Sequence, residues 1–302
     1  MQKFKWSEKT KLDRAGMKVV QLLQAQAFQA FWVGGIVRNQ LIGKKLKVKS
    51  DNIDIASDAT PDQVERILNQ AKVHNKPVGK KFGSILAIVD GEKIEITTFR
   101  SEGRYSDNRH PDRVEFIQDY LIDAKRRDFT INALYFDPIK KQLYDPVGGI
   151  SNLKSRILKF VGDPKKRIDE DALRMLRGVR LATQLGFKLE KNSFAAIKTR
   201  AKYIQGISGE RIKAELDKIL LSKNRVSGLR LLQASGLLRF IAPEISALNK
   251  VSHKSKTYHL EGNVFEHTLL VLEALKKKNL PLMYSAIFHD SGKVSKIGRA
   301  HV

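Results

Sequence analysis

The chain has 302 residues, of which 42% are hydrophobic, and this is enough for two or three small domains with buried cores. It contains no cysteine, which excludes a disulfide framework and a thiolate zinc site, and no apolar run approaches the length of a membrane span. Lys and Arg outnumber Asp and Glu by 56 to 32, and the formal charge of +24 is spread along the chain, so we expect a polyanionic partner. The N-terminus lacks the apolar core of a signal peptide, which predicts a cytoplasmic protein.

The first elements with chemical content lie near residue 30. A helix is predicted over residues 9–27 and a short apolar strand over 30–33, followed directly by Gly34 and Gly35. Paired glycines let the backbone approach a bound phosphate, and a helix that opens immediately after them directs its positive end at that anion. Arg38 falls in the first turn of this helix. The pattern indicates a phosphate-binding turn.

A second strand with polar side chains is predicted at residues 52–55. Polar and apolar residues alternate there, so Asn52 and Asp54 are expected to share one face. Two oxygen ligands on one strand face suit Mg²⁺ when phosphate oxygens and water complete its octahedron.

A third acid follows in the next predicted elements. Residues 60–71 are typical of a capped helix, and residues 82–100 of a β-hairpin. Glu95 lies on the second strand of the hairpin and can share a metal ion with Asp54 if the two strands are neighbours. An isolated glutamate would otherwise face solvent. Residues 101–113 have no apolar periodicity and are predicted to form a mobile loop.

An Arg-Arg-Asp run at residues 126–128 is the next polar cluster. Forked guanidinium donors suit a triphosphate, and a carboxylate accepts from a ribose hydroxyl. Taken alone, such a run is usually a surface ion pair. A turn cluster at 145–149 then ends the mixed region, and the pattern beyond it is helical. We therefore predict an α+β fold.

These motifs, in this order, resemble those of the class II tRNA nucleotidyltransferases and bacterial poly(A) polymerases, which carry Gly-Gly-x-Val-Arg-Asp, Asp-x-Asp, a third carboxylate and Arg-Arg-Asp-Phe-Thr-Ile-Asn. Asn39 and Asn52 stand where the family has aspartates, and the segment 44–50 is longer than usual. The resemblance runs from about residue 18 to residue 222. It implies a nucleotidyltransferase head with a mixed sheet and helices, a helical nucleotide-selecting and RNA-binding neck, and a helical body, at residues 1–149, 150–224 and 225–302.

The resemblance also implies the site residues and a two-ion Mg²⁺ site. The catalytic and metal-binding candidates are Asp54, Glu95, Asn52 and Asp51, where Asp51 can replace the amide of Asn52 as a ligand. The candidates for holding the triphosphate and ribose of the nucleotide are Gly34, Gly35, Arg38, Arg127 and Asp128.

A helix predicted over residues 169–180 carries the candidates for choosing the base. Asp171, Arg174 and Arg177 fall at i, i+3 and i+6, within one broad helix face. In the family this helix contacts the Watson–Crick edge of CTP or ATP, and a guanidinium does donate to cytosine acceptors while a carboxylate accepts from an exocyclic amine. The plain alternative is a salt bridge on a solvated face.

The last block resembles an HD-type metal phosphohydrolase. His267 and the adjacent pair His289 and Asp290 are candidate ligands of another divalent metal. That ligand set needs a further Asp that the chain does not reach, so we predict a partial HD-type domain. The last residues, 297–302, resemble translated vector sequence, and we expect a gene fragment.

The function implied by the resemblance is template-independent addition of CCA, from CTP and ATP, to the 3′ end of tRNA, with no membrane involved. Poly(A) polymerases and enzymes that add only CC or only A share these motifs, although residues 79–84 lack the Arg-rich stretch of the poly(A) branch. Two other classes stay open. Because Asn52 replaces the first metal-binding Asp, the chain can be a catalytically silent RNA-binding protein, and the last block allows a phosphohydrolase.

Overall fold

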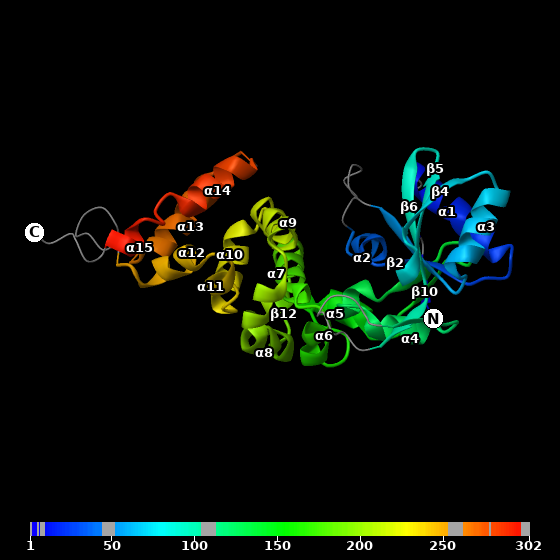
Figure 1. The fold of residues 1–302 in the computed structure, drawn as a ribbon, viewed down its shortest axis with the longest axis horizontal. Helices are drawn as coiled ribbons and strands as arrows, with labels where there is room; N and C mark the ends of the chain where they lie inside the picture. Colours follow the sequence, from blue (N-terminus) through cyan, green and yellow to red (C-terminus); the bar gives the residue numbers. More distant parts are fainter. Residues whose placement is uncertain are drawn as a thin grey trace, which may run out of the picture. The chain divides into compact units, whose positions relative to one another are not determined.

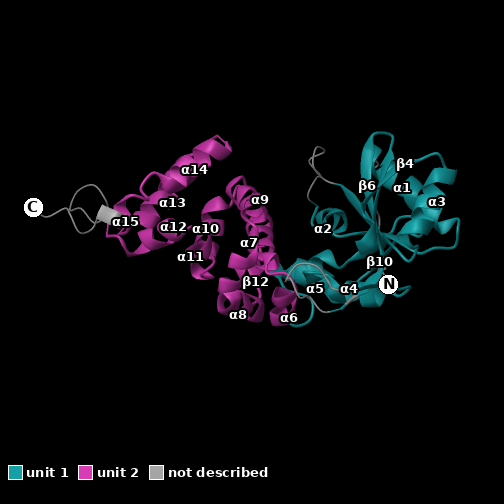
Figure 2. Ribbon diagram, viewed as in Figure 1, with its two compact units in different colours: residues 1–163 teal, residues 164–302 magenta. Residues whose placement is uncertain are grey.

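The computed structural model describes residues 2–4, 6, 10–43, 52–103, 113–252, 262–277 and 279–296. The chain folds into two compact units, residues 1–163 and residues 164–302 (Figure 2). The first unit combines a mixed sheet with helices, and the second is built mainly from helices (Figure 1). The predicted α+β fold class is therefore confirmed.

The first unit extends beyond the boundary expected at residue 149. Helix α5 (Gly149–Ser155) packs closely against the 3₁₀ helix η2 (Thr130–Asn132), and a Cβ atom at Gly149 would lie 2.3 Å from the Thr130 carbonyl oxygen. The hydroxyl of Thr130 also donates to Asn152 Oδ1 at 2.7 Å. The turn cluster at 145–149 thus leads into a helix that belongs to the first unit. The further division of the helical part at residue 224 stays a prediction.

An eight-stranded sheet forms the centre of the first unit, in the order β1-β10-β9-β2-β3-β6-β5-β4. Strands β3 and β6 run parallel, and the other neighbouring strands pair antiparallel. The strands are β1 (Gln2–Lys3), β2 (Ala30–Val33), β3 (Ile53–Ser57), β4 (His74–Gly79), β5 (Ser84–Val89), β6 (Glu92–Thr98), β9 (Tyr135–Asp137) and β10 (Gln142–Tyr144).

The hairpin of β5 and β6 forms as predicted. Its turn residues Asp90 and Gly91 both have positive φ, at 53° and 81°, as a tight two-residue hairpin turn requires. Strand β4 was not predicted. It is the edge strand of the sheet, with mostly exposed side chains and Pro77 in its middle, so it lacks the apolar alternation by which strands are recognised.

One face of the sheet is covered by helices α1 (Lys11–Gln24) and α3 (Pro61–Gln70), which Figure 1 shows together on one side of the strands. Both helices begin with a capping box. Helix α3 begins at Pro61 as the sequence predicts, whereas α1 begins at Lys11, two residues later than predicted, because Thr10 caps it. A Cβ atom at Gly16 of α1 would lie 2.7 Å from Ile53 Cδ1, so the isoleucines of β3 point toward this helical layer. Because side chains alternate along a strand, the polar residues between them point to the other face.

That other face carries an aromatic cluster. It consists of Phe31, Phe99, Tyr120, Tyr135 and Tyr144, whose rings pack edge-to-face, tilted or stacked with centroids 5.3 to 6.4 Å apart. The cluster packs around Ala56, toward the end of β3, and helix α4 (Tyr120–Arg126) adds to it. Asp54, near the start of β3, therefore lies two residues from Ala56, around which the aromatic cluster packs.

The prediction of a loop over residues 101–113 is wrong at its N-terminal end. Ser101 and Glu102 belong to β7 (Arg100–Glu102), which pairs antiparallel with β8 (Val114–Phe116). Backbone pairing of this kind needs no apolar periodicity, and the sequence pattern therefore missed it. Residues 104–112 lie outside the described residues.

The remaining elements of the first unit are α2 (Gly35–Leu41), η1 (Lys80–Phe82) and β11 (Ile157–Leu158). The second unit contains α6 (Pro164–Glu170), α7 (Leu173–Leu185), β12 (Lys188–Leu189), α8 (Lys191–Arg200), η3 (Ala201–Gly206), α9 (Gly209–Leu220), α10 (Arg225–Ala234), α11 (Leu238–Ile241), α12 (Pro243–Ala247), η4 (Leu248–Lys250), α13 (Val264–Ala274), α14 (Leu280–Phe288) and α15 (Lys293–Lys296). Among the described residues, none of these helices is long and apolar enough to cross a membrane.

Candidate active site

Asp54 on β3 and Glu95 on β6 occupy paired positions on neighbouring parallel strands. Side chains at paired positions point to the same face of a sheet. Since the isoleucines on either side of Asp54 point toward the helical layer, both carboxylates lie on the opposite face, where each is half-buried. The two strands are therefore neighbours, as the metal-site prediction required.

The glycine turn lies beside Asp54. Val33, the last residue of β2, pairs with Asp54, and Gly34 follows as the residue that precedes α2. Gly34 has φ 73° and ψ −134°, a conformation that favours glycine, and a Cβ atom there would lie 3.5 Å from Asp54 Oδ2. The fold thus brings the glycine turn, Gly34 and Gly35, at the end of β2 together with the acidic side chains of β3 and β6.

Arg38 on α2 is linked to the Arg-Arg-Asp region through amide side chains. Its Nη1 donates to Asn132 Oδ1 at 2.6 Å, and its Nε and Nη2 donate to Asn39 Oδ1 at 3.1 and 2.9 Å. The amide of Asn132 in turn donates to Asp128 Oδ1 at 3.1 Å, which also accepts from the backbone N–H of Phe129. The predicted nucleotide-binding residues Arg38 and Asp128 therefore belong to one hydrogen-bonded chain. Asn132 was not predicted, although it ends the Thr-Ile-Asn part of the motif.

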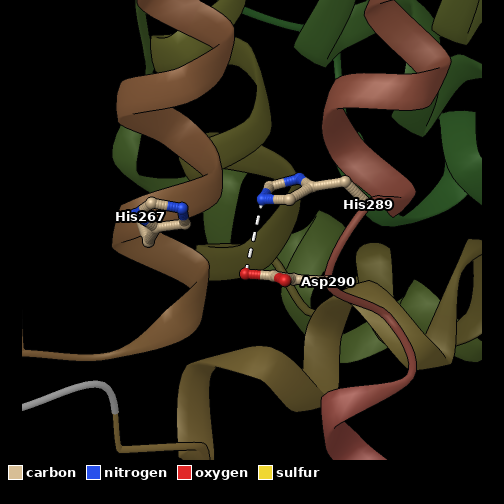
Figure 3. Close-up of side chains that lie close together, drawn as sticks. All are labelled: His267, His289 and Asp290. Carbon is tan, nitrogen blue, oxygen red and sulfur yellow. Dashed lines mark ion pairs between the residues drawn. The ribbon is translucent and has the colours of Figure 1, made fainter.

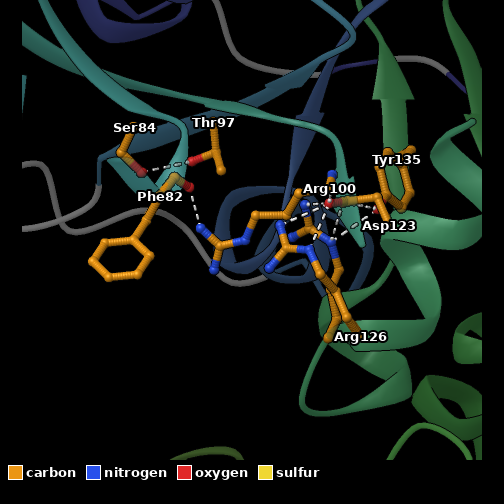
Figure 4. A network of polar contacts seen from close by, with 8 residues as sticks. Phe82, Ser84, Thr97, Arg100, Asp123, Arg126 and Tyr135 are labelled. Carbon is orange, nitrogen blue, oxygen red and sulfur yellow. Dashed lines mark hydrogen bonds and ion pairs between the residues drawn. The ribbon is translucent and has the colours of Figure 1, made fainter. Parts of the chain in front are cut away.

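Arg127 belongs to a buried network around Asp123, a residue that the sequence analysis missed (Figure 4). The Asp123 side chain is 0% exposed and pairs with both Arg126 and Arg127, while the Tyr135 hydroxyl donates to it at 2.6 Å. The Arg127 guanidinium also lies 5.0 Å from the centre of the Tyr135 ring. The available signal was the i, i+3 and i, i+4 spacing of Asp123 to the two arginines on a helix.

The network shifts the pKa values of its members. Burial by itself would raise the pKa of Asp123, but the guanidiniums of Arg127 and Arg126, together with the Tyr135 hydroxyl, lower it from 3.8 to about 2. Burial raises the pKa of Tyr135, and the neighbouring Asp123 carboxylate raises it further. Burial would lower the pKa of Arg127, but its interactions with Tyr135 and with the Asp123 carboxylate keep it above its usual value. Asp123 is therefore ionised and Tyr135 neutral near pH 7.

Among the described residues, no contact places the candidate metal ligand Asn52 in the site. Asn52 is an exposed residue directly before β3. Asp51 lies outside the described residues. Their roles stay predictions.

The base-selecting candidates of the second unit do not share one helix, so that prediction is wrong in part. The helix expected over residues 169–180 is broken, because Asp171 lies between α6 and α7. Its carboxylate accepts from the backbone N–H of Leu173 at 3.1 Å, and such a local bond competes with helix continuation. Arg211 Nη2 lies 3.4 Å from the same carboxylate. Arg174 and Arg177 do lie on α7, and Arg174 pairs with Glu170 of α6.

His267, His289 and Asp290 come together in the second unit, although their segments are separated in sequence. His267 lies on α13, the other two lie at the end of α14, and one ligand atom from each lies within 4.8 Å of the others (Figure 3). His289 Nε2 lies 3.3 Å from Asp290 Oδ2, and Lys293 Nζ lies 2.8 Å from it. Burial would raise the pKa of Asp290, but Lys293 and the two histidines lower it.

A mixed sheet with paired acids beside a glycine turn, together with a helical unit, defines the fold of a nucleotidyltransferase head with a helical extension. Residues 30–159 match the family described as "Poly A polymerase head domain", and residues 186–248 match the one described as "Probable RNA and SrmB- binding site of polymerase A". The chain belongs to the family of poly(A) polymerases and class II tRNA nucleotidyltransferases.

Individual relatives agree with this assignment. The chain is 41% identical to a CCA-adding enzyme of Staphylococcus saprophyticus over 67% of its own length and 48% of that protein. It is 41% identical to a CCA-adding enzyme of Enterococcus faecalis over 70% of its own length and 50% of the relative. The crystal structure of the Bacillus stearothermophilus CCA-adding enzyme in complex with CTP is 28% identical, with a TM-score of 0.70 over 96% of this chain and 72% of that chain. The chain thus spans about half the length of the curated relatives it matches.

The lowered pKa of Asp123 predicts an acid-sensitive contribution to stability. The contribution is present above pH 3.8 and is lost as the pH falls through the folded-state value of about 2. Since one unit of pKa corresponds to about 1.4 kcal/mol, it amounts to roughly 2 kcal/mol. We expect the urea midpoint of Asp123→Asn to fall less steeply than that of the wild type between pH 5 and pH 2.5. Parallel curves for the two proteins would contradict this.

Proposed function

We propose that the chain is a template-independent nucleotidyltransferase that adds CCA, from CTP and ATP, to the 3′ end of tRNA. The observation that carries the proposal is the parallel register of β3 and β6, which places Asp54 and Glu95 on one face beside Gly34. Support comes from the 41% identity to CCA-adding enzymes in a match that covers 67% of the chain. Had the two acids pointed to opposite faces, they could not share an ion, and only RNA binding would have been left.

Asp54 and Glu95 fit a Mg²⁺ site. Both are half-buried carboxylates on adjacent strands, and Gly34 places no side chain next to Asp54 Oδ2. Mg²⁺ bound there would neutralise phosphate charge and favour the deprotonated 3′-hydroxyl. Asp51 or Asn52 would supply the third ligand of a two-ion site.

The other residues of the first unit hold the nucleotide. Gly34 and Gly35 let backbone N–H groups approach the phosphates, and Arg38, fixed by Asn39 and Asn132, adds forked donors. Arg127 and Asp128 would hold the triphosphate and ribose. In the reaction the 3′-hydroxyl of the RNA loses its proton, its oxygen bonds to the α-phosphorus, and the bond to the leaving oxygen breaks, releasing pyrophosphate.

The second unit would choose the base and bind the RNA. Asp171 offers a carboxylate acceptor, while Arg174 and Arg177 offer donors for the Watson–Crick edge of cytosine or adenine. A charge of +24 over the chain and the family match at residues 186–248 support phosphate contacts with tRNA, which salt should weaken. Poly(A) polymerases and CC-only or A-only enzymes share these features and form the alternative within the class.

A second divalent metal at His267, His289 and Asp290 is favoured by a specific observation. His289 Nδ1 lies 2.8 Å from the Ala286 carbonyl oxygen, which fixes the hydrogen on Nδ1 and leaves a lone pair on Nε2. Nε2 lies 3.3 Å from Asp290 Oδ2, so a divalent cation could take both atoms as ligands. Phosphohydrolase activity would need a further carboxylate ligand, so we propose a metal site without hydrolysis.

Incubation of the full chain with tRNA that lacks its CCA end, and with each nucleotide separately and together, tests the function. We expect C addition from CTP alone and one further A when both nucleotides are present. Asp54→Asn and Glu95→Gln should each lower kcat at least about a hundredfold, or about 2.7 kcal/mol, because each removes a metal-binding charge.

Glu92→Gln is the matched control for these two variants, because Glu92 lies on the same strand as Glu95, three residues away, and so on the other face. It should retain wild-type kcat. Long A tracts without C incorporation would instead support a poly(A) polymerase, and tRNA binding without any incorporation would support a silent RNA-binding protein.

The amide at position 52 is predicted to be tolerated. Asp54 and Glu95 already supply two ligands, and Asp51 is close enough in sequence to replace the missing carboxylate. We expect Asn52→Asp to change kcat less than tenfold when initial rates of CMP incorporation are compared. A rise from undetectable turnover to rapid addition would show that Asn52 silences the chain.

The proposed second metal site predicts Co²⁺ binding through imidazole ligands. Titration of the full chain with Co²⁺ should produce a visible absorption band that His267→Ala and His289→Ala reduce at least tenfold at equal metal concentration. His74→Ala changes an exposed histidine of β4 and serves as the control. A band that survives both variants but disappears with Asp54→Asn would exclude this site.

A further inference from the structure

The Asp123 carboxylate accepts hydrogen bonds from three segments of the first unit, namely β7, the end of α4 and β9 (Figure 4). Its Oδ1 accepts from Arg126 Nε at 2.8 Å and from the backbone N–H of Arg100 at 3.3 Å. Its Oδ2 accepts from Arg127 Nη2 at 3.1 Å and from the Tyr135 hydroxyl at 2.6 Å. One buried charge therefore holds two guanidiniums, each on its own oxygen.

Two partners, Asp123 and Tyr135, fix the orientation of Arg127. Its Nε lies 2.9 Å from the Tyr135 hydroxyl, which in turn donates to Asp123, so the three groups form a closed triangle. The Arg127 side chain is only 16% exposed. These bonds use its Nε and Nη2 groups, and its Nη1 edge lies outside the triangle. An anion that approaches Arg127 would therefore meet a preset edge of the guanidinium.

The same network reaches the strand of Glu95. The Arg100 guanidinium donates to the carbonyl oxygen of Phe82. Gly83 is the one residue between Phe82 and the start of β5. At the start of β5, Ser84 pairs with Thr97 of β6, two residues from Glu95, and their hydroxyl oxygens lie 3.4 Å apart (Figure 4). Asp123 thus connects the arginine pair to the part of the sheet that carries the proposed metal ligands.

We propose that Asp123 is a positioning residue for the triphosphate of the nucleotide. Asp123 does not contact the nucleotide. Its charge orients the guanidiniums of Arg127 and Arg126 so that they can bind the phosphates. The inference rests on the proposed function, since it assumes that this unit binds a nucleoside triphosphate. A residue with a merely structural role would affect all ligands of the folded protein alike, whereas a residue that positions Arg127 affects only ligands with a triphosphate.

The test compares CTP with CMP in equilibrium titrations of the full chain in the presence of Mg²⁺. Asp123→Asn keeps the shape of the side chain and removes its charge, so the guanidiniums lose their common anchor. We expect the Kd of CTP to rise at least tenfold and that of CMP less than twofold, with unchanged helical and strand content. Tyr135→Phe removes one member of the triangle and should raise only the Kd of CTP, about threefold, which keeps the test decisive if Asp123→Asn does not fold.

Asp58→Asn is the matched control in the same unit. The Asp58 carboxylate accepts from the backbone and side-chain N–H groups of Gln29 at 2.8 and 3.0 Å and has no guanidinium partner among these bonds. Its loss should leave the ratio of CTP to CMP affinity unchanged. An unchanged ratio in Asp123→Asn and Tyr135→Phe, with lower stability, would overturn the positioning role alone. Failure of the wild type to bind CTP would overturn the proposed function, and this inference with it.

Discussion

The parallel pairing of β3 with β6 is the constraint on which the rest of the first unit depends. After the hairpin turn that follows β5, strand β6 pairs with β5 on one side and with β3 on the other. The register between β3 and β6 aligns Asp54 with Glu95. A slip of one residue would turn one of the two acids toward the helical layer, into the position of a buried isoleucine. The capped helices α1 and α3 hold that layer in place, so the register is specified by apolar packing and the acids follow from it.

Charged groups beside the site are arranged in two different ways. Arg38 is held by the neutral amides of Asn39 and Asn132, and it is joined through Asn132 to Asp128. Arg127 is held by the charged Asp123 in a buried network, where removal of one member would leave an uncompensated charge. Both arrangements remove rotamer freedom from the guanidiniums before a ligand arrives, which reduces the entropy that binding must overcome.

Two candidate site residues of the helical unit, Asp171 and Asp290, lie at helix ends. Asp171 interrupts the path from α6 to α7 by bonding a backbone N–H group, and Asp290 follows the end of α14 beside His289. Polar side chains at such positions find backbone partners that helix interiors do not offer. The family assignment covers both units, whereas the proposed activity rests on the geometry of the first unit and on relatives that are about twice as long.

The sequence by itself determined the fold class, the glycine turn, the hairpin with Glu95 and the start of α3, because capping residues, paired glycines and apolar alternation are local signals. It also identified His267, His289 and Asp290, which the structure brings together. Only the tertiary structure decided that Asp54 and Glu95 share a face, since strand order is not encoded in either strand. The edge strand β4, the break at Asp171 and the buried role of Asp123 were likewise decided by contacts between segments. An exposed edge strand lacks alternation, and a carboxylate near arginines has the same sequence pattern whether it lies on the surface or in the core.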